Sequence, residues 1–457
     1  MLLDLSVELL EAIGTQLPQR DHAVLRQVCK DLNGAVSRLF FSALTLKTSK
    51  NGLGEDGVKK LKVLANGETG WSLHARILHI MPAKAANEAH DEKPVDLLAA
   101  ALGSLLNIKT VVWHAPEQGF WAWGQTVIAT FLNALDTLDD LELNISGTIN
   151  LSTLQVQHLR NFTLRRTDRN WERWRPRHMQ MTQPLPSIYQ DIAQLVCQNR
   201  LTSLHLEGIN HLSVVWRTLR SAKSATRMRL TEITTSVVTQ DLFDYLTSYS
   251  GLEKLTLKFP DGGNVEESNR LADRFFETVL PRHAESLTEL SCPAAYQSRF
   301  SFGTHNVNVV SLLHKLTKLE MSINAGAVRR VTPPKSFIGP DGKERRVISI
   351  GISVEAEQAD IDPVVTLLLE TAAVFPTLHS LTILSADTER NRGALCGSGR
   401  IRHKGAVDAA IGKAVKAFRT DVPCSAIVRA GHGTHELRPL PDEGGLAYEQ
   451  TGRWSRY

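Results

Sequence analysis

Several large classes of protein are excluded by what this sequence lacks. No apolar run reaches the roughly 20 residues that a membrane-spanning helix needs, so no membrane partner is expected. Cysteines are few and form no CxxC pair, which predicts neither a disulfide framework nor a structural zinc site. Their scatter is typical of a reducing compartment, so we expect a cytoplasmic or nuclear protein. The five cysteines are Cys29, Cys197, Cys292, Cys396 and Cys424.

Motifs of catalysis and cofactor binding are lacking as well. The sequence has no Walker A loop and no GxSxG, HExxH or GxGxxG motif. His432, His435 and Glu436 come nearest to a metal-ligand set, but Gly431 and Gly433 argue against a helix there. A polar surface loop explains this segment better than a metal site. We therefore expect no enzyme activity, no cofactor and no metal; a metal-dependent hydrolase that uses the two histidines is an alternative.

Charge of one sign is not in excess either. The 52 basic residues are nearly balanced by 48 acidic ones, which gives a net charge of +4. That small excess is not enough to argue for a nucleic-acid partner, and none is expected. A chain of 457 residues, 42% of them hydrophobic, can bury a large core. It is too long for one ordinary globule unless it is a repeat array.

Two short amphipathic helices are predicted near the N-terminus. In the first, Leu9, Leu10, Ile13 and Leu17 fall on one stripe. Ser6 precedes this stripe and is predicted to cap the helix by accepting a bond from a first-turn amide.

The second helix is predicted to begin at Asp21, its cap. Leu25, Val28 and Leu32 then repeat at helical spacing, and residues 35–41 offer a further apolar stripe. Three helices within 45 residues bury a very small core, so this unit needs a partner or the following domain for stability.

Residues 1–45 resemble the F-box, the helical module that joins a protein to a cullin-based ubiquitin ligase. The family pattern runs Leu-Pro-x-Glu-Leu/Ile-Leu and ends its second helix with Val-Cys-Arg/Lys, and here Ser6 stands at the usual proline. The resemblance implies a Skp-family adaptor and the cullin ligase core as partners. The residues that it implies for adaptor binding are Leu5, Glu8, Leu9, Leu10, Ile13, Leu17, Leu25, Val28, Cys29 and Lys30.

A short phrase, Leu-x-x-Leu-x-Leu, recurs through residues 46–440. It is the strand half of a leucine-rich repeat, and its fourth and sixth residues point to the same side of a strand. Further copies are expected near Phe162–Leu164 and Met228–Leu230. The clear and looser copies are 138–143, 201–206, 252–257, 316–321, 378–383, 75–80, 108–113 and 287–290.

Helical spacing of apolar residues separates these phrases. Strand and helix in alternation predict an α/β fold with parallel strands and outer helices, here an irregular leucine-rich-repeat solenoid. An ordinary α/β domain is the alternative, and residues 441–457 are expected to be a disordered tail. The predicted helices are 94–107, 120–135, 188–198, 239–248, 266–280, 361–374 and 406–417.

An F-box joined to such repeats resembles the F-box and leucine-rich-repeat class of ligase adaptors. That resemblance implies a substrate-recognition adaptor of an SCF-type ligase, with a protein target of unknown identity held on the repeats. The alternative takes residues 1–45 as a terminal cap of the array. The protein would then be an interaction scaffold with no link to ubiquitination.

Two segments interrupt the repeats. Residues 328–355 contain two β-rich runs around Gly339-Pro-Asp-Gly342, which predicts an inserted hairpin whose second run, around Ile348, can double as a repeat strand. Six arginines and two tryptophans lie within residues 165–178. This pattern is typical of a solvated loop, but basic residues interleaved with aromatics can also bind nucleic acid or an acidic peptide. As a substrate site it would suit an acidic or phosphorylated target. The candidate substrate-binding residues are Arg165, Arg166, Arg169, Trp171, Arg173, Trp174 and Arg175.

Overall fold

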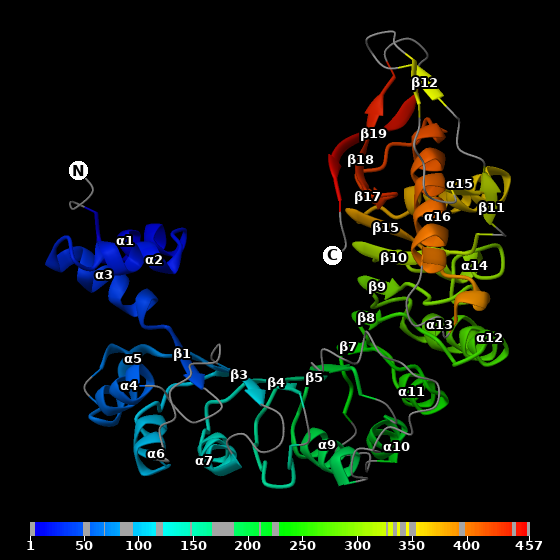
Figure 1. Ribbon diagram of the computed structural model, residues 1–457. Coiled ribbons are helices and arrows are strands. Elements are labelled where there is room, and N and C mark those ends of the chain that lie inside the picture. The colour runs from blue at the N-terminus through cyan, green and yellow to red at the C-terminus, as the bar shows by residue number, and fades with distance from the viewer. Residues whose placement is uncertain are drawn as a thin grey trace. The chain divides into compact units, whose positions relative to one another are not determined.

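Short strands alternate with helices through most of the chain, which confirms the predicted α/β class. In the computed structural model they form two units, and in each unit the helices between the strands lie along one side of them (Figure 1). Unit 1 comprises Met1–Arg169, Met181–Gly208 and Ala222–Met228, and the rest of the chain forms unit 2. The structure describes residues 5–48, 55–67, 69–82, 95–115, 122–146, 149–166, 187–209, 212–221, 228–325, 328–331, 336–338, 344–346, 353–392, 398–440 and 445–454.

The strands of unit 1 follow one another in sequence order and pair in parallel. Burial alternates along them, because successive side chains point to opposite faces of a sheet. One face packs against the helices and the other carries mainly polar side chains. The strands are β1 (Ala43–Thr48), β2 (Ile77–Pro82), β3 (Thr110–Ala115), β4 (Asp140–Ile145), β5 (Asn161–Arg166) and β6 (Ser203–Glu207).

The register of these strands aligns the repeated phrase across the unit. The side chains at the sixth position of the phrase form a row across the sheet from Leu46 to Leu206. The strand β5 confirms the copy expected near Phe162–Leu164. Each fully buried leucine in such a row contributes about 1.5–3 kcal/mol relative to an exposed one. The row at the fourth position consists of Leu44, Leu78, Val111, Leu141, Phe162 and Leu204, all buried.

Helices follow most strands of unit 1, but β4 is followed by an irregular segment, residues 149–160. Leu151 and Leu159 of this segment are buried, so its backbone groups need partners inside the protein. Asn199 supplies them: its side chain accepts from Leu159 N (2.8 Å) and donates to Val156 O (2.9 Å). The helices after β1 are α4 (Glu55–Ala65), α5 (Gly70–His74), α6 (Val95–Gly103), α7 (Ala122–Asn133) and α9 (Ser187–Gln198).

Unit 2 continues the same alternation and ends in an antiparallel segment. The row at the fourth position of the phrase starts at Ile233 in this unit. The copy expected near Met228–Leu230 therefore lies a few residues later, and Leu230 is its leading leucine. The row continues through Leu255, Leu290, Leu319, Leu381 and Val428. The parallel strands are β7 (Glu232–Thr235), β8 (Lys254–Leu257), β9 (Glu289–Cys292), β10 (Lys318–Ile323), β15 (Ser380–Ser385) and β17 (Ile427–Ala430).

The helices of unit 2 agree broadly with the predicted ones. The helix predicted over 266–280 is divided by a π-helical turn, η3, before Pro281, which lacks the N–H that would continue the helical ladder. No helix of the described residues is both long and apolar enough to cross a membrane. The helical elements are α10 (Ser213–Ser221), α11 (Gln240–Leu246), α12 (Val265–Arg274), η3 (Phe275–Val279), α13 (Leu280–His283), α14 (Val307–Val310), α15 (Gln358–Ala373), η4 (Glu389–Asn391) and α16 (Ser398–Ala417).

The inserted hairpin predicted at 328–355 is present. Two nested antiparallel pairs form it, but Ile348 lies outside the described residues. Among the described strands, β10 pairs directly with β15 in parallel. The pairs join β11 (Val328–Val331) to β14 (Ser353–Ala356) and β12 (Ser336–Ile338) to β13 (Glu344–Arg346).

The C-terminal tail predicted to be disordered over 441–457 contains a strand over Leu446–Arg453. Over its described part, residues 445–454, backbone pairing with the preceding strand satisfies the amide groups and orders the segment. Tyr448 is buried there, so an apolar side chain also ties the strand down. The antiparallel strands are β16 (Arg419–Thr420), β18 (Gly433–Pro439) and β19 (Leu446–Arg453).

We predict that Asn199→Ala lowers the free energy of unfolding by about 1–3 kcal/mol, because it leaves buried backbone groups of residues 156 and 159 without partners. Urea denaturation measures the change. The matched control is Asn133→Ala. Asn133 bonds the same segment through Thr153 O and Gln155 N but is exposed, so water replaces its bonds and the change stays within about 0.5 kcal/mol. Equal losses in the two variants would contradict the account.

Candidate functional site

The N-terminal module is built from α1 (Val7–Thr15), α2 (Gln19–Leu25) and α3 (Lys30–Phe40). Its buried core consists of only four side chains, Leu10, Leu32, Ala35 and Val36, against which Leu25 and Cys29 pack in part. A core of this size is small even for a module of forty residues, so contacts outside it must contribute to stability.

The second predicted helix is two helices in the structure. A turn over residues 26–28 ends α2, and Cys29 adopts an extended conformation (φ −157°) before α3 begins. Because α2 already begins at Gln19, Asp21 lies inside the helix and is not its cap. Arg26 stabilises this turn, since its Nε donates to Asn33 Oδ1 and Ser37 Oγ. The turn leaves Val28 exposed while it brings α3 against α1.

Ser6 occupies the N-cap position of α1, as predicted, but its side chain makes no cap bond to a first-turn amide. It hydrogen-bonds to the Glu8 carboxylate instead. The pKa of Glu8 is lowered by a bond from its own backbone N–H and, to a smaller extent, by the Ser6 bond. Glu8 is therefore held as an anion in the first turn, where the helix dipole favours negative charge.

An apolar stripe remains exposed along α1. Leu9 and Ile13 are 53% and 45% exposed, and Leu5, which precedes the helix at the same spacing, is 36% exposed. We call these three residues the α1 stripe. Neither the module's own core nor the segment from β1 to α5, which we call the first repeat, covers it. Exposed apolar side chains that share one helix face mark a surface available to another protein.

The other residues predicted to bind an adaptor differ in how far they are exposed. Leu10 is only 4% exposed and belongs to the core, which corrects its place among the contact residues. Val28 is 63% exposed. Glu8 and Lys30 are also exposed, whereas Leu17, Leu25 and Cys29 are half-buried.

An aromatic cluster joins the module to the first repeat. Phe41 packs edge-on against Trp71 of α5 at 4.9 Å, and Arg26 lies over the rings of Phe40 and Phe41 at 4.6 and 4.3 Å. A side chain at Gly70 would collide with the Phe41 ring. The strand β1 follows α3 almost directly, so the predicted module boundary at residue 45 falls inside the first strand of the sheet.

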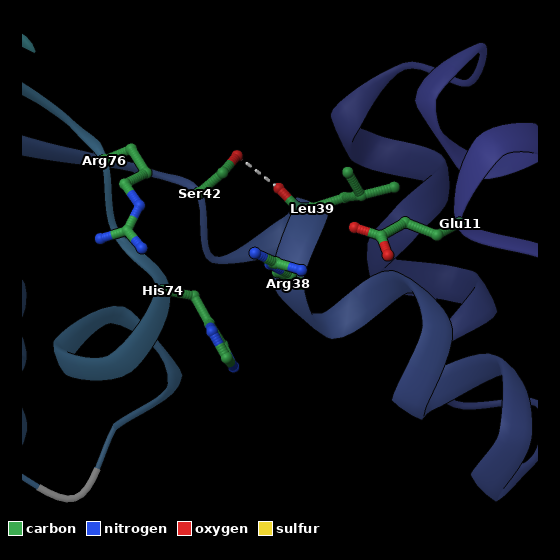
Figure 2. Close-up of a pocket in the computed structure, with 6 residues that line it drawn as sticks. All are labelled: Glu11, Arg38, Leu39, Ser42, His74 and Arg76. Atoms are coloured by element: carbon green, nitrogen blue, oxygen red, sulfur yellow. Dashed lines mark hydrogen bonds between the residues drawn. The ribbon is translucent and has the colours of Figure 1, made fainter. Parts of the chain in front are cut away.

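A pocket of about 590 Å³ lies beside this joint. Arg38 and Leu39 come from the end of α3, His74 ends α5, and Arg76 precedes β2 (Figure 2). Glu11 of α1 and Ser42 complete the lining. Sequence reasoning missed this pocket, because its residues are brought together only by the joint between the module and the first repeat.

Charged side chains line the strand face opposite the helices of unit 1. Arg165 of β5 forms ion pairs with Glu142 of β4 (2.9 Å) and Glu207 of β6 (3.6 Å). Burial lowers the pKa of His114 on the same face, and Glu142 opposes that effect. Arg165 is therefore engaged by carboxylates of its own sheet, and an acidic target would have to compete with them.

The rest of the arginine and tryptophan run is not brought into this site. Arg166 ends β5 beside Arg165. The remaining predicted substrate-binding residues lie outside the described residues: Arg169, Trp171, Arg173, Trp174 and Arg175.

The two histidines near the C-terminus lie in different surroundings. His435 is buried in β18, with Nε2 3.3 Å from Ala430 O, and burial lowers its pKa. His432 is exposed and lies 4.0 Å from an oxygen of Asp408. The polar surface loop expected here is therefore a strand at His435. No group of three or more metal-ligating side chains occurs in the part of the chain that the structure describes.

Known protein families give no match to this chain, and no curated protein matches it either. The chemistry of the site therefore has to be read from its own residues.

We predict that substitutions of two neighbouring leucines of α1 change the stability of the module by very different amounts. Leu10→Ala removes a core side chain and should lower the local stability of the module by about 2–5 kcal/mol. Leu9→Ala removes an exposed one and should change it by less than about 0.5 kcal/mol. Hydrogen–deuterium exchange over α1 and α3 measures both changes. A comparable loss of protection in the two variants would show that Leu9 is also packed.

Proposed function

We propose that the protein is a substrate-recognition adaptor of an SCF-type ubiquitin ligase. The α1 stripe, together with the F-box resemblance of residues 1–45, carries the proposal. In this interpretation α1–α3 dock on a Skp-family adaptor, and the strand array holds a target protein.

The exposure of the stripe favours docking over the cap interpretation. A terminal cap of a repeat array presents a polar outer surface, because its task is to end the apolar core. Here Leu9 and Ile13, one helical turn apart, face away from a core of four side chains. A partner that covers these leucine and isoleucine side chains would extend that core.

The aligned rows of both units support the leucine-rich-repeat interpretation of the array. Buried apolar residues at the fourth and sixth positions recur from strand to strand in each unit, with helices along one side. This arrangement leaves the opposite strand face to polar side chains such as Glu142, Arg165 and Lys254. In each unit this charged strand face is a surface that a target protein can bind, and no further chemistry is needed from the chain itself.

An adaptor of this kind acts through proximity. Holding a target on the same complex as a ubiquitin-charged enzyme raises the effective concentration of the target's lysines near the reactive thioester. The chain's own contribution is to bind and orient, which fits a sequence without catalytic motifs.

We predict that Leu9→Ser with Ile13→Ser weakens binding of the full-length protein to a purified Skp-family adaptor at least about thirtyfold, as expected for apolar side chains at the centre of an interface. Surface plasmon resonance measures the affinity, and circular dichroism confirms the fold. The matched control is Leu73→Ser with Leu106→Ser. These two leucines are 65% and 71% exposed but lie outside the module, and their loss should leave binding unchanged.

Two results would contradict the proposal. Adaptor binding that survives the loss of the α1 stripe would mean that the stripe is not the docking surface. A wild-type chain that does not bind a Skp-family adaptor would favour the interaction scaffold without a link to ubiquitination.

A further inference from the structure

We propose that the pocket at the joint between the module and the first repeat binds a phosphate group. Three nitrogen-bearing side chains, Arg38, His74 and Arg76, surround one open space there, with Glu11 as the single carboxylate (Figure 2). The proposal is independent of the ligase function, because it depends on this pocket and not on the α1 stripe.

The donors of this pocket are largely unused. Among the described residues, Arg38 and His74 have no hydrogen-bond or ion-pair partner, and Arg76 donates one bond, from Nη1 to Asn107 O (3.0 Å). Other arginines near this joint are engaged. Arg26, for example, bonds Asn33 and Ser37 and lies over two aromatic rings. The pocket thus holds two arginines and one histidine against the single carboxylate of Glu11, and a bound anion would offset this excess of positive charge.

The geometry suits phosphate better than a carboxylate. The donors come from three separate places in the chain, the end of α3, the end of α5 and the residue before β2. A tetrahedral phosphate offers oxygens in as many directions, and arginine forks bind such oxygens through charge-assisted bonds. A ligand held by Arg38 on one side and by His74 and Arg76 on the other would also tie the module to the first repeat.

Ser42 does not compete for this role. Its hydroxyl donates to Leu39 O at 2.6 Å, so it presents only acceptor capacity to the pocket. The carboxylate of Glu11 repels a bound anion. Removal of its charge should therefore strengthen phosphate binding, whereas removal of a neighbouring positive charge should weaken it.

Isothermal titration calorimetry of the full-length protein with inorganic phosphate tests the proposal. Arg38→Gln and His74→Gln should each weaken binding about tenfold, the usual loss for one charge-assisted bond. Glu11→Gln should strengthen it. The matched control is Arg20→Gln, which removes the same charge from an exposed arginine of α2 outside the pocket (side chain 86% exposed) and should leave the affinity unchanged.

A parallel titration with O-phosphoserine distinguishes the source of the phosphate. Tighter binding of phosphoserine than of inorganic phosphate would support a phosphorylated side chain as the ligand, and equal affinities would support a free anion. The proposal is overturned if neither compound binds, if Arg38→Gln and His74→Gln bind like the wild type, or if Arg20→Gln weakens binding as much as they do.

Discussion

The alignment of apolar side chains across neighbouring parallel strands is the constraint from which the rest of this structure follows. In unit 1 the row from Leu44 to Leu204 fixes the register of six strands, because a shift by one residue would turn every buried side chain to the polar face. Once that register is set, the helices must cover the side to which the rows point. The opposite face is then left to charged residues such as Arg165 and its two carboxylate partners.

The N-terminal module depends on the same array. Its own core of four side chains cannot offset the ordering of three helices alone. The chain runs from α3 into β1, and the cluster of Phe40, Phe41 and Trp71 fixes the joint. Because the joint uses the end of α3, the outer side of α1 is left uncovered. The α1 stripe and the pocket lined by Arg38, His74 and Arg76 are thus both consequences of how a small helical unit is attached to the first repeat.

Much of the array could be predicted from sequence because the repeated phrase encodes its own burial pattern. The strand at Phe162 was predictable from spacing alone. The strand β1 was not recognised, because Phe41 stands where the repeated phrase begins with leucine. Helical spacing predicted one helix from Asp21 to Leu32, since periodicity does not register a turn that the Arg26 side chain stabilises. Periodicity also groups Leu9 with Leu10, and only the packing of α1 on α3 separates the exposed leucine from the buried one. The pocket is lined by residues as far apart in the sequence as Glu11 and Arg76, and no local sequence pattern predicts that they lie close together.

The central claim, that α1 presents a docking surface for a Skp-family adaptor, is tested most directly by hydrogen–deuterium exchange of the full-length protein with and without that adaptor. The account predicts added protection confined to residues 5–40, with exchange in β7–β10 unchanged. Protection that appears in the strand array and leaves α1 unchanged would contradict it.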